Sequence, residues 1–131
     1  MTKRINIGVE VPSMYKKLSS MEEELKELTL KAGINEGFVH LLKLKASQIN
    51  KCAYCIRLHT KDALDCKESI ERISVIAAWE ESDYFSSKEK ACLSLVEAIT
   101  LVSENQVPDE VYEKAKEVLT KEELIAVEWL A

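Results

Sequence analysis

Two cysteines and a histidine stand close together in the middle of the chain, in the segment Cys52–His59 with the pattern C-x-x-C-x-x-x-H. On a helix each residue advances by about 100°, so Cys52 and Cys55 lie about 60° apart on one face. His59 falls between them on that face, and it is the i+4 neighbour of Cys55, within hydrogen-bonding reach. The segment therefore combines two thiols within disulfide reach and an imidazole that can handle a proton. A thiol redox centre needs these parts, because one sulfur attacks a peroxide or a disulfide and the other resolves the product.

The expected position of Cys52 favours its ionised form. We expect Cys52 to stand in the first turn of a helix, where free backbone N–H groups and the helix dipole stabilise a thiolate.

Three alternatives compete with this interpretation. A C-x-x-C can arise by chance, and free cysteines are common core residues. A zinc site is the second, but structural zinc sites use four ligands, and Cys66 lies about 21 Å further along the same helix if that helix is straight. In the third alternative the cysteines alone are active, and His59 is a surface or core histidine whose hydrogen bonds are satisfied and which takes no part in the chemistry. Cys66 and Cys92 look structural, because Cys92 belongs to an apolar helix face.

The composition favours long helices in one domain covering residues 1–131. Apolar residues make up 47% of the chain, which is enough for a sizeable core. With only 3 Gly and 2 Pro there is little material for the many tight turns of a β-sandwich. The fold class that we predict is therefore all-α, a compact multi-helix domain of about six or seven helices.

The charge pattern excludes several kinds of partner. The formal net charge is -5, and lysine and arginine are scattered, so neither a nucleic acid nor an anionic membrane is expected to bind. The basic start of the chain has no apolar segment behind it, and no apolar run approaches the length of a membrane span. We expect a cytoplasmic protein.

Periodicity and capping signals predict where the helices lie, whereas residues 1–12 carry no clear period. The first helix should end at Gly33 and carry a narrow apolar stripe that must pack against something. Its apolar positions are Met14, Leu18, Met21, Leu25 and Leu28. Further helices are expected at about 36–49, 52–64, 69–80 (with Ile70, Ile73, Ile76 and Ala77 inward), 87–104, from Pro108 and from Thr120.

Two of these helices should begin with a capping box, at Ser86–Glu89 and at Thr120–Glu123. The helix at 87–104 is apolar on most of its surface, which indicates burial in the domain or in a subunit interface. Trp79 and Trp129 read as core or interface residues. The pattern stops at Ala131 without a glycine or proline, so we expect either that the last residues pack on a partner or that the native chain runs further.

The residues around the cysteines resemble the alkylhydroperoxidase D-like branch of the carboxymuconolactone decarboxylase superfamily. In that branch a helix ending in a similar K-x-x-A-S-Q-I-N run leads into C-x-x-C-x-x-x-H. The resemblance covers nearly the whole chain after residue 35. It is carried by LKLKASQINKCAYCIRLHT at 42–60, AAWEES at 77–82, FS at 85–86, EKA at 89–91 and VPDEVY at 107–112.

The resemblance implies an all-α fold that assembles as a homotrimer or homohexamer. It also implies a thiol peroxidase-like or disulfide-reducing activity without haem, flavin or metal. Carried over by position, Cys55 would be the peroxidatic thiol, deprotonated with the help of His59, and Cys52 the resolving thiol. True carboxymuconolactone decarboxylases lack this cysteine pair, so decarboxylation is not expected.

One position departs from the family pattern. The proton relay of the family commonly includes a glutamate twelve positions before the first cysteine, and this chain has His40 there. His40 is either a substitute base or a polar residue that fills the space of the glutamate. Glu36, one turn earlier, or Glu80 could supply a carboxylate instead.

The leading hypothesis is a thiol oxidoreductase with Cys52, Cys55, His59 and His40 as site residues and no cofactor. Its substrates would be a hydroperoxide or a disulfide, and a dithiol electron donor would restore the cysteine pair. The alternative is a non-catalytic oligomeric module that uses the pair for redox sensing or for binding a partner.

Overall fold

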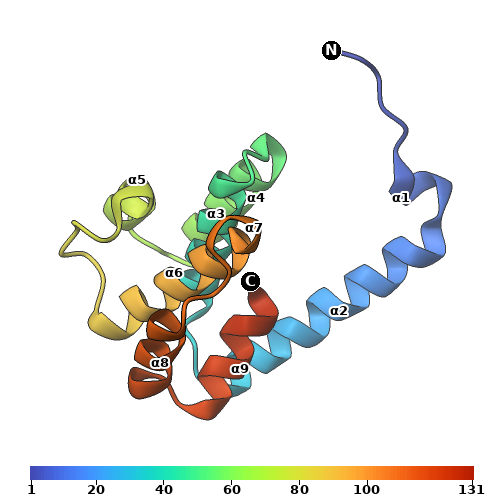
Figure 1. Ribbon diagram of the computed structural model, residues 1–131. Helices are drawn as coiled ribbons and strands as arrows, with labels where there is room; N and C mark the ends of the chain where they lie inside the picture. The colour runs from blue at the N-terminus through green and yellow to red at the C-terminus, as the bar shows by residue number, and fades with distance from the viewer.

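The computed structural model describes all 131 residues, and every regular element in it is a helix (Figure 1). The all-α prediction is therefore confirmed, but the chain forms nine α-helices instead of six or seven. In chain order the elements are α1 (Ile7–Glu10), α2 (Pro12–Lys31), α3 (Glu36–Ile49), α4 (Ala53–Asp65), α5 (Ile70–Val75), the 3-10 helix η1 (Ile76–Ala78), α6 (Ser87–Thr100), α7 (Val102–Asn105), α8 (Asp109–Val118) and α9 (Lys121–Leu130).

The additional helices are short and come from local signals. α1 is a single turn that begins because the Asn6 side chain accepts hydrogen bonds from the backbone N–H groups of Gly8 and Val9. The helix expected at 87–104 is divided at Leu101, where α6 ends and α7 begins.

The helix expected at 69–80 tightens after α5 into the 3-10 turn η1. In a 3-10 helix the side chains at i and i+3 eclipse, so Ile76 and Trp79 are directed to the same side, and both are buried. Ile73 is also buried, as expected. Ile70 and Ala77 are exposed, which corrects their predicted inward orientation.

The core forms where α3, α6 and α9 meet beneath η1 and α8. Cys92 is buried in it, as predicted, and so is Trp79, whose indole N–H donates to Glu97 at 3.0 Å. Trp129 is 66% exposed and is no part of the core. The largest fully buried side chains are Leu41, Leu42, Leu44, Ile76, Leu93, Leu95, Val96 and Val127.

A left-handed residue ends each of the helices α2, α3 and α4. These residues are Gly33, Lys51 and Lys67, with φ of 79°, 54° and 62°. At the end of α3, the N–H of Lys51 donates to the carbonyl of Gln48, and the N–H of Cys52 donates to the carbonyl of Ser47. This Schellman pattern reverses the chain within two residues. It thereby fixes Cys52 as the residue that joins α3 to α4.

One of the two predicted capping boxes forms completely. The Ser86 hydroxyl accepts from the N–H of Glu89, and the Glu89 carboxylate accepts from the N–H of Ser86. At α9 only the first half is present, because the Glu123 carboxylate pairs with Lys88 instead.

Helix α2 projects from the rest of the molecule as an arm, with α1 and the N-terminus at its far end (Figure 1). Its C-terminal part packs on α9 and α3, but of its 20 residues only Thr29 is buried. The outer half of the predicted apolar stripe, Met14, Leu18 and Met21, is more than half exposed. None of the helices combines the length and the apolar character that a membrane crossing requires.

Candidate active site

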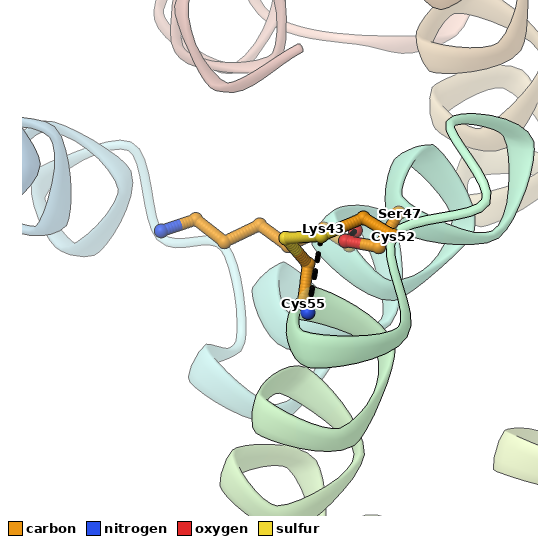
Figure 2. Close-up of a disulfide and its surroundings, with 4 residues drawn as sticks. All are labelled: Lys43, Ser47, Cys52 and Cys55. Carbon is orange, nitrogen blue, oxygen red and sulfur yellow. Dashed lines mark hydrogen bonds between the residues drawn. A yellow bond between two sulfur atoms is a disulfide. The ribbon is translucent and has the colours of Figure 1, made fainter. Parts of the chain in front are cut away.

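Cys52 and Cys55 are joined by a disulfide at the junction of α3 and α4 (Figure 2), with their Cα atoms 5.3 Å apart. The prediction that the two sulfurs lie within disulfide reach is therefore confirmed. Cys52 is the N-cap of α4, and its sulfur accepts a hydrogen bond from the backbone N–H of Cys55 at 3.3 Å. Both cysteines are partly exposed. A reductant or a substrate can therefore approach the sulfurs from solvent.

Side chains of the preceding helix lie beside the disulfide. Figure 2 shows Lys43 and Ser47, which are one turn apart on α3. The Ser47 hydroxyl donates to the carbonyl of Lys43 at 2.7 Å, and the Lys43 amine donates to the Glu22 carboxylate of α2 at 2.7 Å. This ion pair ties the arm to the helix that carries the site.

The two histidines of the chain meet across α3 and α4. The rings of His40 and His59 are stacked, with centroids 6.1 Å apart and an angle of 25° between their planes. Asp62, one turn after His59, directs its Oδ2 toward both rings, 3.9 Å from Nδ1 of His40 and 4.0 Å from Nδ1 of His59. The structure thus brings together two of the predicted site residues and adds a carboxylate that the sequence analysis did not consider.

Asp62 could have been found from the sequence by its spacing. It stands three residues after His59 on the same helix, where an acidic side chain faces an imidazole. Of the two other candidate carboxylates, Glu36 lies beside His40, with ligand atoms of the two residues within 4.8 Å, and Glu80 does not. Glu36 lines the same cavity as His40, whereas Glu80 lines different cavities together with Trp79.

Burial keeps the two imidazoles neutral at neutral pH. It lowers the pKa of His40 and outweighs the opposing effect of the Asp62 carboxylate. Burial is also the main reason that the pKa of His59 is lowered, and the positive charge of Lys43 acts in the same direction, as would that of a protonated His40. A neutral imidazole can accept a proton, and it can also bind a metal ion.

A cavity of about 480 Å³ opens beside the histidines, between α2, α3 and α4. Its wall includes His40, His59 and Asp62, the aliphatic side chains of Leu25 and Leu58, and Lys43. Neither Cys52 nor Cys55 contributes to this wall. The cavity is therefore a place where a small molecule or an ion could contact the imidazoles directly.

The remaining cysteines have no disulfide partner. Cys66 caps the C-terminal end of α4 and is partly exposed, and burial raises the pKa of its thiol. Cys92 is 4% exposed, and burial raises its pKa to about 12. Both thiols are protonated at neutral pH, which supports their interpretation as structural residues.

The all-helical fold and the C-x-x-C-x-x-x-H segment at the N-terminus of a helix together define a class of thiol-containing proteins. Comparison with known proteins identifies the family to which the chain belongs. The model of the carboxymuconolactone decarboxylase family matches residues 12–98. This chain belongs to that family, in its alkylhydroperoxidase D-like branch.

Two relatives extend the likeness to nearly the whole chain. The uncharacterised protein YdfG of Bacillus subtilis (strain 168) is 37% identical over 125 residues, which is 95% of this chain and 82% of YdfG. The crystal structure of ATU0492 from Agrobacterium tumefaciens superposes with a TM-score of 0.88 at 29% identity, covering 98% of this chain and 86% of that one. ATU0492 is described as a protein of unknown function and a candidate antioxidant defence protein, AhpD.

Proposed function

We propose that this protein is a cytoplasmic thiol-dependent peroxidase or disulfide oxidoreductase that cycles Cys52 and Cys55 between dithiol and disulfide. The observation that carries the proposal is the Cys52–Cys55 disulfide itself, which is partly exposed at the N-terminus of α4. The antioxidant description of a structural relative supports the same class of chemistry. No cofactor is needed, because two thiols can supply both electrons of the reduction.

The proposed cycle has three steps. The thiolate of Cys55 attacks one oxygen of a hydroperoxide ROOH, the O–O bond breaks, and ROH leaves after taking up a proton, with a sulfenic acid remaining on Cys55. The thiolate of Cys52 then attacks that sulfur, which forms the disulfide and releases the hydroxyl group as water. A dithiol donor reduces the disulfide by exchange and becomes a disulfide itself. When the oxidant is a disulfide instead of a hydroperoxide, the first step is also thiol–disulfide exchange. In that exchange the protein dithiol reduces the substrate disulfide and becomes a disulfide itself.

The family pattern and the local geometry favour different cysteines as the attacking sulfur, and the proposal follows the family pattern. The family pattern gives the attack to Cys55, whereas the backbone N–H bonded to the sulfur of Cys52 would stabilise a thiolate on Cys52. His59 is proposed as the group that removes the thiol proton, with His40 as its neighbour in the relay.

The test is peroxide turnover with single cysteine variants. Reduced wild-type protein should consume organic hydroperoxide repeatedly with a dithiol donor, and Cys55→Ser should abolish turnover. Cys52→Ser should form one sulfenic acid per chain, detectable by mass spectrometry after dimedone trapping, and then stop. Cys66→Ser and Cys92→Ser are matched controls that should retain turnover.

The same experiment tests the alternative function. A redox-sensing or binding module would oxidise once per chain and show no multiple turnover with any dithiol donor. That result would refute the peroxidase proposal.

We also propose that the protein assembles into a homotrimer or homohexamer through the α1–α2 arm. The exposed apolar residues of the arm support this proposal, because a contiguous exposed apolar stripe is typical of an association surface. A second copy of the chain is the proposed partner.

A further inference from the structure

Three side chains of α3 and α4 bring metal-ligand atoms close together in the wall of the cavity. One nitrogen of His40, one nitrogen of His59 and one carboxylate oxygen of Asp62 all lie within 4.8 Å of one another. Oδ2 of Asp62 is 3.9 Å from Nδ1 of His40 and 4.0 Å from Nδ1 of His59. We propose that His40, His59 and Asp62 form a binding site for one divalent transition-metal ion such as Zn²⁺. This proposal goes beyond the redox function and uses neither cysteine of the disulfide. It shares His59 and His40 with the proposed relay, so a bound ion would prevent these imidazoles from accepting the thiol proton.

The spacing of the three atoms fits an ion between them. Because no two of the three atoms are more than 4.8 Å apart, a point exists about 2.8 Å or less from each, whereas zinc binds imidazole nitrogen and carboxylate oxygen at about 2.0–2.2 Å. Small side-chain rotations of His59 and Asp62, which share one helix, would close the difference. Without an ion the same distances are too long for hydrogen bonds between the carboxylate and either ring.

The histidines carry an unexplained feature that an ion would satisfy. Nδ1 of His40 and Nδ1 of His59 are both inaccessible to solvent, and neither has a hydrogen-bond partner. Buried polar atoms are almost always paired, and an unpaired one is explained by strain, by a catalytic role, or by a bound water or ion. Two such atoms that face the same carboxylate favour a cation, because an ion would be coordinated by both nitrogens and one oxygen at once.

The donor set indicates the kind of ion and the openness of the site. Two neutral imidazoles with one carboxylate suit zinc and other first-row transition ions better than magnesium or calcium, which prefer oxygen ligands. The cavity of about 480 Å³ borders all three residues. A site with three protein ligands would take water or a small ligand as its fourth ligand, and this cavity is the side from which that ligand would enter.

A competing donor set shares His40 but is weaker. Glu36, His40 and Cys66 also bring ligand atoms within 4.8 Å of one another. The Glu36 carboxylate, however, already pairs with the Lys26 amine at 3.3 Å. In the proposed site, the neighbouring Lys43 amine is neutralised by Glu22, so it does not leave an unpaired positive charge beside the ion.

The experiment uses the oxidised protein, because the intact disulfide removes Cys52 and Cys55 as ligands. Zn²⁺ alone is titrated by calorimetry, and Co²⁺ alone is titrated by visible absorption, which reports the coordination geometry. The expected result is one ion per chain with a dissociation constant on the order of micromolar or tighter. Histidine ring signals in NMR spectra should shift on binding of Zn²⁺.

Conservative variants locate the site. Asp62→Asn and His59→Gln should each weaken binding at least tenfold, with the unliganded fold checked by circular dichroism. Asp65→Asn, one turn further along α4 and exposed, should leave binding unchanged, and so should Cys66→Ser. Loss of binding in Cys66→Ser would overturn the proposal in favour of the competing set.

Two further outcomes would also overturn the proposal. One is no stoichiometric binding by wild-type protein, and the other is weak binding of several ions that persists in Asp62→Asn. None of these measurements depends on turnover, so failure of the peroxidase proposal leaves the metal site to be judged separately.

Discussion

His40 and His59 stack on each other from adjacent helices, with their ring centroids 6.1 Å apart and Asp62 facing both. At the position where the family pattern commonly has a glutamate, His40 thus places an imidazole next to the histidine of the cysteine motif. The carboxylate that faces both imidazoles comes from Asp62 on α4, while Glu36 on α3 lies near His40 alone. Two imidazoles offer two groups that can each accept a proton near neutral pH, whereas a glutamate would hold an imidazolium by its opposite charge.

The first prediction tests whether His40 takes part in proton transfer. His40→Gln should lower kcat/KM for hydroperoxide by about 10- to 100-fold, because general-base assistance typically contributes at least this much. The disulfide should still form when excess oxidant is given enough time. Stopped-flow oxidation of the reduced protein in EDTA measures the rate. Glu36→Gln is the control in the same cavity, and an equal loss in both variants would argue against a specific relay through His40.

The second prediction concerns the ion pair between Arg72 and Glu89, which joins α5 to α6. Burial opposes ionisation of Glu89, but hydrogen bonds from Arg72 and from the Ser86 backbone outweigh it, and the pKa of Glu89 is lowered. The stabilisation from this group should therefore be complete above the unfolded pKa of about 4.3. It should be lost as pH falls through the lower pKa of the folded state.

Chemical denaturation between pH 7 and pH 3 measures this effect. At pH 7, Glu89→Gln should lower the free energy of unfolding by about 2 kcal/mol, and the difference from wild type should shrink as pH falls below about 4. The neighbouring exposed residue Glu71 is the control, and Glu71→Gln should change stability little. A difference for Glu89→Gln that stays constant across this pH range would contradict the prediction.

The third prediction concerns the reactivity of the buried thiol. Burial raises the pKa of Cys92 to about 12, so almost no thiolate exists at pH 8. In reduced native protein, Cys92 should resist iodoacetamide for hours, and it should react at once in denaturant. Peptide mass spectrometry of alkylated protein gives the rate at each cysteine. Rapid native alkylation of Cys92 would show that the core opens readily at α6.

The fourth prediction tests the arm as an assembly surface. Leu18→Glu with Met21→Glu should convert the assembled protein to smaller species, because two carboxylates would be placed in an apolar contact. Size-exclusion chromatography with light scattering measures the mass. Ser19→Glu adds a charge on a different side of α2 and should leave the assembly intact. A monomeric wild-type protein would rule out the proposed assembly.

The sequence by itself determined most helix boundaries and the cysteine pair. The end of α2 at Gly33 and the box at Ser86 follow from hydrogen bonds between residues that are close along the chain. The closeness of Cys52 and Cys55 follows from the three-residue spacing within one turn. Such features depend on local geometry, and a pattern in the sequence is enough to predict them.

The tertiary structure decided which side chains from different helices meet. His40 faces His59 because α3 packs along α4, and no spacing within one helix specifies that contact. The break between α5 and η1 was also outside the sequence pattern, since the burial of Ile76 and Trp79 against other helices overrides the preference for a continuous helix. The exposure of Met14, Leu18 and Met21 has the same origin. An apolar stripe shows that a helix can pack, but the arrangement of the other helices determines whether anything in the same chain covers it.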